Sequence, residues 1–300
     1  MGVKGLYTYL KAYRAEKYDC VSGAPPLRIG FDAMSMLYKY KASYADMYPL
    51  LEAFKKAGHT LFFVFDGKPP VEKEAEVKDR RDARESATTQ AHTIKEHLED
   101  KTISVKERQI LEYSLARLEF QGWHMTRDIR HTFQKVLWDM GIPYVKALGE
   151  ADDVLSDMAV AGKLDVVVST DMDFLLSGVQ RLWIPLRSRY DGFEEICLKD
   201  VLKGEGMSLA MLRDAGILCG VESLRGKLCL ASHVAFSWIR YYGSIEALVE
   251  SGMNEPQLET LKDVELVEKV RARFQANTDS WQAHIRPDHL ERCRAFLETL

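Results

Sequence analysis

The feature that most constrains the fold is a series of short apolar runs separated by segments with a helical pattern. The two clearest runs are Leu27–Asp32 and Leu61–Asp66, and a glycine and two prolines close the second. Ile142–Val145, Asp165–Thr170 and Arg181–Ile184 continue the series. Near-continuous apolar strands with helices between them are typical of a parallel sheet covered on both faces. The sequence therefore predicts an α/β fold whose central, mainly parallel sheet is flanked by helices.

The series is interrupted once and then ends. Residues 72–130 hold many charges and good helix formers but no convincing strand, which predicts a helical insertion. After residue 205 the pattern is helical to the end of the chain. We therefore expect a core built from residues 1–71 and 131–205, the insertion, and a helical C-terminal region over 206–300.

Composition excludes several classes of protein. No run reaches the roughly 18 apolar residues that a membrane span needs, and no apolar leader opens the chain, so we expect an intracellular protein without a membrane partner. The five cysteines are scattered and form no C-x-x-C pair, so neither a zinc site nor a disulfide framework is indicated. The net charge of −4 argues against a protein that holds nucleic acid by overall basicity.

Acidic residues gather at the ends of the apolar runs. Asp32 and Asp66 each follow a run directly, while Asp171 and Asp173 follow a third run two positions apart. Glu150–Asp153 opens a helical stretch. One aspartate after a strand is usually a helix cap or a turn residue. In parallel α/β sheets, however, ligands bind outside the carboxyl ends of the strands, where these side chains would converge.

Carboxylates that converge in this way need cations. Two like charges about 4 Å apart cost around 4 kcal/mol at an effective dielectric near 20. Oxygen-rich sites suit Mg²⁺ or Mn²⁺. Two such ions would activate a water and stabilise a leaving phosphate oxygen. The residues alone therefore predict metal-dependent phosphoryl chemistry.

Five ordered motifs make the chain resemble a known family. They are Met1–Leu6, Ile29–Ser35, Phe63–Pro70, Gly149–Asp152 and Thr170–Asp173. Together they resemble the flap endonuclease family of structure-specific 5′ nucleases, whose core is PIN-like, over about residues 1–250. The resemblance implies that the insertion forms a helical arch and that the C-terminal region contains a helix-hairpin-helix-like element for duplex binding.

The resemblance also implies a set of metal ligands, with two Mg²⁺ ions for which Mn²⁺ can substitute. The first ion and its water would be held by Asp32, Asp66, Glu150 and Asp152, and the second ion by Asp171 and Asp173. Glu222 stands where the family has a seventh, aspartate ligand, and its extra methylene would move the carboxylate oxygen. We interpret Asp153 as an ordinary first-turn acid.

Further residues match positions that contact nucleic acid in the family. By resemblance, Lys73 and Arg80 contact the scissile phosphate from the arch, Tyr38 stacks on a base, and Gly2 lies close to the active site. Without the resemblance, the two basic residues would be interpreted as a solvated helix face. Tyr38 fits a core tyrosine equally well.

The chain also departs from the family. Leu228–His233 lacks both glycines of the family's hairpin, so the duplex-binding element is degenerate. The C-terminus lacks an aromatic-ended tail that binds a sliding clamp, and we expect a monomer. These departures leave three functions open.

The leading hypothesis is a Mg²⁺-dependent 5′ flap endonuclease or 5′ exonuclease. It would act on flap, branched or nicked DNA in replication and repair, in the nucleus or wherever the DNA is replicated. One alternative is an RNA-cleaving nuclease on the same fold. The other is a nucleic-acid-binding protein that has lost catalysis.

Overall fold

The computed structural model describes residues 3–17, 25–40, 43–69, 74–100, 102–186, 192–224, 226–253, 255–279 and 281–298. Its strands, in chain order, are β1 Arg14–Lys17, β2 Arg28–Asp32, β3 Thr60–Phe65, β4 Tyr144–Lys146, β5 Val166–Val168, β6 Arg181–Pro185 and β7 Phe193–Cys197.

Helices make up most of the remaining chain. The α-helices are α1 Leu6–Tyr9, α2 Ala33–Tyr40, α3 Tyr44–Lys56, α4 Glu74–Leu98, α5 Val105–Gly122, α6 Arg127–Asp139, α7 Ala151–Val160, α8 Asp173–Ser177, α9 Leu198–Glu205, α10 Leu209–Gly220, α11 Ser232–Tyr242, α12 Ile245–Glu250, α13 Val264–Ala272 and α14 Pro287–Leu297. Short 3₁₀ turns lie at η1 Leu10–Tyr13, η3 Glu222–Leu224, η4 Pro256–Lys262 and η5 Trp281–His284. Within the described ranges, none of these helices has both the length and the apolar character to cross a bilayer.

The strands of the described chain form one sheet in the order β1-β7-β6-β5-β2-β3-β4. The five strands from β6 to β4 run parallel, and these are the five that the apolar runs predict. The α/β fold with a mainly parallel sheet is therefore confirmed. The sequence analysis missed β1 and β7, which add to the edge in antiparallel fashion. These two strands contain charged residues and therefore show no apolar run. Glu194 of β7 is buried, with its Oε2 2.7 Å from Nη1 of Arg14 in β1.

Alternation along the strands gives the sheet two different apolar faces. Phe63 and Phe65 of β3 point to one face, where they meet Phe133 of α6. Phe62 and Val64, at the intervening positions, belong to an aliphatic core that includes residues of α7, α8 and α10. Because both faces are covered, the parallel strands are buried except at terminal residues such as Arg28 and Thr60, and polar groups are left to the strand ends.

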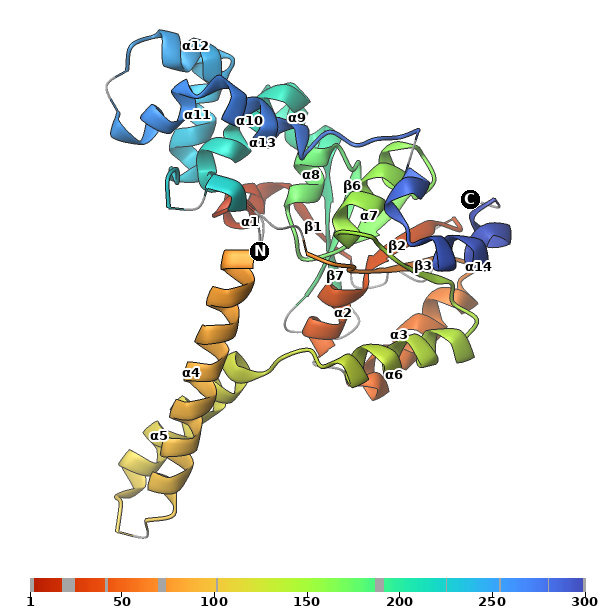
Figure 1. Cartoon of the computed structure of the whole chain (residues 1–300), viewed down its shortest axis with the longest axis vertical. Helices are drawn as coiled ribbons and strands as arrows, with labels where there is room; N and C mark the ends of the chain where they lie inside the picture. The colour runs from red at the N-terminus through yellow and green to blue at the C-terminus, as the bar shows by residue number, and fades with distance from the viewer. Residues whose placement is uncertain are drawn as a thin grey trace. The chain divides into compact units, whose positions relative to one another are not determined.

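The chain divides into two compact units, one of residues 1–68 and 133–300 and the other of residues 69–132. The first contains the sheet together with the C-terminal helices. The second contains α4 and α5, which lie side by side as a helical hairpin (Figure 1). Within it, Lys95 of α4 pairs with Glu119 of α5 at 2.7 Å.

Candidate metal centre

Strand register brings three chain segments together at the carboxyl edge of the sheet. Asp32 is the last residue of β2 and lies beside Val64 of β3. On the other side of β2, Phe31 lies beside Val168, the last residue of β5. The residue that follows Val168 is therefore level with Asp32, and the residues after β3 and β5 leave the sheet on either side of it.

Asp32 is buried and held by hydroxyl and amide donors. Its Oδ2 accepts hydrogen bonds from Ser35 Oγ at 2.6 Å and Ser169 Oγ at 2.9 Å. Its Oδ1 accepts from the backbone N–H of Met34 at 2.9 Å and of Ser35 at 3.1 Å, at the start of α2. Burial raises the pKa of Asp32, and the negative charge of Asp171 also raises it. The hydrogen bonds from Ser35 and Ser169 lower this pKa, but the net effect is a rise.

Asp66 is oriented by the start of α7. Its Oδ1 accepts the backbone N–H of Ala151, the first residue of that helix, at 2.9 Å. Gly67 makes this approach possible, because a Cβ there would lie 2.2 Å from the carbonyl oxygen of Ala147 and 2.4 Å from that of Leu148. The glycine lets the backbone after β3 lie in close contact with the segment that leads into α7, which brings Asp66 near Glu150.

Asp152 is close to several other carboxylates. Burial raises its pKa well above the ordinary value for an aspartate. Negative charges from the segments around it raise that pKa further, namely those of Asp171, Asp32, Asp66 and Glu150. These five carboxylates come from three strand ends and from the start of α7, and we call them the carboxylate cluster.

Asp173 is tied to the beginning of the chain. Its Oδ1 accepts the backbone N–H of Val3 at 2.8 Å, and its own N–H donates to Asp171 Oδ1 at 3.0 Å. In the segment after β5, the carboxylate of Asp171 is thus held by a backbone N–H of the same segment, and the carboxylate of Asp173 by the N-terminal segment. This contact joins residues 170 positions apart in the sequence.

The donor set of the carboxylate cluster fits a hard divalent cation. Its ligand atoms are carboxylate oxygens, which Mg²⁺ and Mn²⁺ prefer, and their mutual repulsion is what a cation would relieve. Among the described residues, no group of three or more acidic, histidine or cysteine side chains is arranged so that it could hold a metal ion. Oxygens of Asp32 and Asp66 accept hydrogen bonds from a hydroxyl group and a backbone N–H, respectively.

The structure places the other predicted site residues differently. Gly2 and Lys73 lie outside the described residues, as does the side chain of Glu222, whose backbone forms part of η3. Arg80 lies in α4 of the second compact unit. Tyr38 lies on α2 with 45% of its surface exposed, so it is not a core residue.

Sequence reasoning missed the groups that hold the carboxylates in place. Ser35 and Ser169 are buried hydroxyls, and Ser35 Oγ lies 3.1 Å from Ser169 Oγ. Arg273, just after α13, places its Nη2 3.6 Å from Glu150 Oε2. Ser35 ends one motif and Ser169 directly precedes another, but serine at a strand or helix end is too common to be informative. Arg273 is far from every motif in the sequence, so no local pattern indicated that it lies near the carboxylates.

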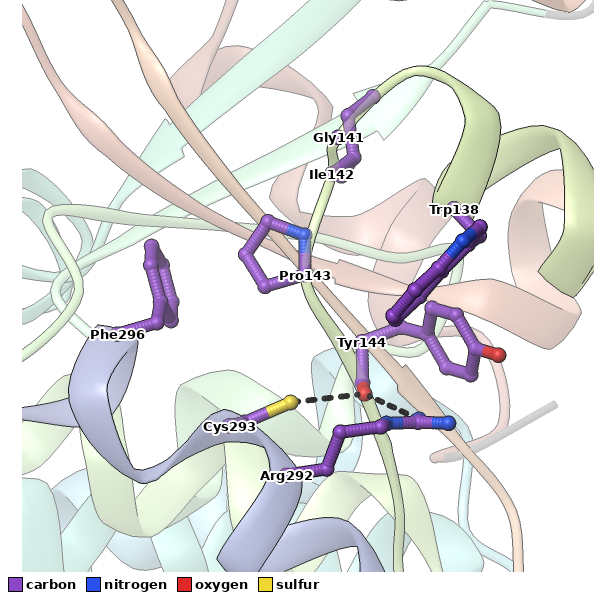
Figure 2. Close-up of a pocket in the computed structure, with 8 residues that line it drawn as sticks. All are labelled: Trp138, Gly141, Ile142, Pro143, Tyr144, Arg292, Cys293 and Phe296. Atoms are coloured by element: carbon purple, nitrogen blue, oxygen red, sulfur yellow. Dashed lines mark hydrogen bonds between the residues drawn. The ribbon is translucent and has the colours of Figure 1, made fainter.

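A separate cavity of about 340 Å³ lies at the other end of β4 (Figure 2). It is lined by Trp138, Gly141, Ile142, Pro143, Tyr144, Arg292, Cys293 and Phe296. The carbonyl of Tyr144 accepts from Arg292 Nη2 and from Cys293 Sγ, each at 3.3 Å. Because Tyr144 begins β4 and no carboxylate lines the cavity, this cavity is distinct from the carboxylate cluster.

Comparisons with known proteins agree with the motifs. The XPG I-region family model matches residues 141–222, which contain β4, α7, β5 and α8. Flap endonuclease 1 of Eremothecium gossypii is 34% identical over 194 residues, which are 63% of this chain and 47% of the relative. The chain therefore spans about half the length of that relative.

Two solved structures share the fold. The catalytic core of Rad2 in complex with a DNA substrate aligns with a TM-score of 0.59 at 16% identity, covering 99% of this chain and 95% of that one. Flap endonuclease-1 from Methanococcus jannaschii aligns with a TM-score of 0.56 at 24% identity, covering 91% of this chain and 84% of that one.

Proposed function

The chain is related to the flap endonuclease family, as its motifs predict, and on this premise we propose that it is a metal-dependent, structure-specific nuclease. It would hydrolyse phosphodiester bonds near the junction of single-stranded and duplex DNA. The observation that carries the proposal is the carboxylate cluster, in which segments far apart in the sequence bring negative charge to one edge of the sheet. A site built in this way repels a phosphate backbone unless divalent cations are present.

The carboxylate cluster and Asp173 would hold two Mg²⁺ ions. When bound, such ions neutralise charge on the scissile phosphate and lower the pKa of an attacking water. The protein's own contribution is to orient the ligands: Ser35 and Ser169 fix Asp32, and the start of α7 fixes Asp66. Arg273 adds a positive charge beside Glu150, which limits the repulsion before a cation binds.

Residues outside the carboxylate cluster would bind the nucleic acid. Lys73 and Arg80 would contact the scissile phosphate, Gly2 would lie near the site, and Glu222 would be a seventh ligand. The 45% exposure of Tyr38 supports stacking on a base, because an exposed ring has a face available to a ligand.

The decisive experiment is cleavage of a labelled 5′-flap DNA, with a matched RNA flap, in the presence and absence of Mg²⁺. We expect Mg²⁺-dependent cleavage of DNA by the unaltered chain. Asp152→Asn should lower kcat by about 100-fold or more, since it removes a charge at the reacting centre. Asp153→Asn is the matched control. Asp153 follows Asp152 in the sequence but has an exposed side chain, so its substitution should keep kcat within about twofold.

The outcomes separate the alternatives. Faster turnover of the RNA flap would favour the RNA-cleaving alternative. That alternative is motivated by Leu228–His233, which lacks both glycines of the family's hairpin, since an RNA-cleaving enzyme would depend less on binding a long DNA duplex. If neither substrate is cleaved and titration with Mn²⁺ shows no saturable site, the proposed activity is wrong and a non-catalytic binding role remains.

A further inference from the structure

The first described residues of the chain, Val3–Gly5, contact two parts of the molecule at once, and we call them the N-terminal turn. On one side, the backbone N–H of Val3 donates to Asp173 Oδ1 at 2.8 Å. On the other side, Lys4 donates its N–H to the carbonyl of the last residue of α10 at 3.4 Å, and its own carbonyl accepts from Ser232 Oγ, at the start of α11, at 3.3 Å. The N-terminal turn therefore lies between a carboxylate at the sheet edge and the two helices that flank the predicted duplex-binding element.

The N-terminal turn fits closely against Ser232. Both hydrogen bonds of Lys4 are long, so neither holds the turn strongly by itself. Gly5 adds a steric fit, because its φ of 70° suits glycine and a Cβ at this residue would lie 2.7 Å from Ser232 Oγ. The hydroxyl of Ser232 thus meets the turn at two successive residues, which fixes where the turn lies.

A buried carboxylate holds the other end of α11 to the residues that follow the N-terminal turn. Glu205, the last residue of α9, is buried and accepts hydrogen bonds from the hydroxyls of Tyr9 at 2.9 Å and Tyr13 at 2.8 Å. Its Oε2 also accepts from Nη1 of Arg240, in the last turn of α11, at 2.9 Å. Burial and the carboxylate of Glu205 raise the pKa of Tyr9 to about 12, so this hydroxyl remains a donor at neutral pH. Because α11 is held to the N-terminal region at both of its ends, a shift of α11 would move the N-terminal turn with it.

We propose that Ser232 is a positioning residue for the metal centre and acts on the Asp173 carboxylate through the N-terminal turn. Its hydroxyl places the backbone of Lys4, and the N–H of the preceding residue orients Asp173. This inference rests on the proposed function, in which Asp173 binds the second Mg²⁺ ion. Ser232 is not itself a ligand, so loss of its hydroxyl should weaken one of the two metal sites rather than remove it.

The test measures Mn²⁺ binding by the full chain without nucleic acid, from the electron paramagnetic resonance signal of the free ion. Ser232→Ala should weaken, by about threefold or more, the site that Asp173→Asn removes, which is the effect expected for the loss of one hydrogen bond. Ser232→Thr keeps the hydroxyl and should keep the affinity. Ser237→Ala is the matched control, because Ser237 lies on the same helix with an exposed side chain.

A double substitution separates positioning from a general effect on the fold. In a chain that carries Asp173→Asn, Ser232→Ala should have no further effect on Mn²⁺ binding, because the carboxylate on which it acts is already changed. In flap cleavage, Ser232→Ala should raise the Mg²⁺ concentration that gives half the maximal rate, and saturating Mg²⁺ should restore kcat.

The positioning role is wrong if the Ser232→Ala chain binds Mn²⁺ as tightly as the unaltered one. It is also wrong if Ser232→Ala weakens binding by the same factor with and without Asp173→Asn. Weaker Mn²⁺ binding by Ser232→Ala, in a chain that cleaves no flap, would contradict the proposed function alone. A chain without any saturable Mn²⁺ site would contradict both.

Discussion

Single residues at the carboxyl edge of the sheet act by controlling how closely backbone segments approach. Gly67 is the clearest case, since it sits where the segment after β3 meets two carbonyl oxygens of the segment before α7. Its N–H also donates to the carbonyl of Gly149 at 2.7 Å. The position of Asp66 therefore depends on the absence of a side chain at the next residue.

Gly67→Ala should destabilise the fold by about 1–3 kcal/mol, because backbone atoms rather than flexible side chains must move to admit the new methyl group. Urea unfolding of the two proteins measures the difference. Gly149→Ala is the matched control from the same contact, since the nearest atom to its new Cβ would be 3.8 Å away. A loss of equal size in both variants would show that close approach at Gly67 is not the cause.

At the scale of elements, one arginine joins three helices of the C-terminal region. Arg271 of α13 donates to both carboxylate oxygens of Asp214 in α10, at 2.8 and 2.7 Å. It also donates to Glu246 of α12, with Nη2 3.0 Å from Oε2. Asp214 is buried, so the arginine compensates a charge that would otherwise be costly to bury.

This arrangement predicts how stability depends on pH. The Arg271 guanidinium lowers the pKa of Glu246 from 4.5 to about 2, so the unfolded chain binds more protons than the folded one between these values. The contribution of Glu246 to stability is therefore complete above about pH 4.5 and is lost as the pH falls toward 2. Glu246→Gln should flatten this part of the curve of unfolding free energy against pH, measured by urea unfolding. An unchanged slope would contradict the assignment.

At the scale of the whole molecule, the two compact units differ in how much apolar surface they bury. Among the side chains that the structure describes, none in α5 is buried, and in α4 the buried apolar ones are Ala87 and Ala91. Strands β2, β3 and β5, by contrast, are buried along nearly their whole length. Local stability should follow this difference.

Hydrogen exchange should therefore show the hairpin opening without global unfolding. We expect amides in the middle of α4 and α5 to exchange faster than those of β2, β3 and β5, whose exchange should require unfolding of the sheet. Mass spectrometry of peptides from each element measures this. Equal protection in the hairpin and the sheet would mean that the chain unfolds as one unit.

Local pattern was enough to predict the central strands and the place where the acids gather. Leu61–Asp66 shows why: its apolar run, its carboxylate and its following turn residues are neighbours in the sequence, so a strand and its end are visible without any partner. The motif Thr170–Asp173 is local in the same way, and together with four other motifs it carried the resemblance to the flap endonuclease family. For such features the information lies within a few residues.

Tertiary structure decided which groups hold those acids and how the sheet ends. The hydroxyl of Ser169 reaches Asp32 only because β5 and β2 are adjacent in register, and the N–H of Val3 reaches Asp173 only because the N-terminal segment crosses to the sheet edge. Between β1 and β7, Arg14 and Glu194 compensate each other's buried charge across the pair of strands. Each of these contacts joins residues more than 130 positions apart, so no local pattern encodes it, and only the packed chain brings the partners within hydrogen-bonding distance.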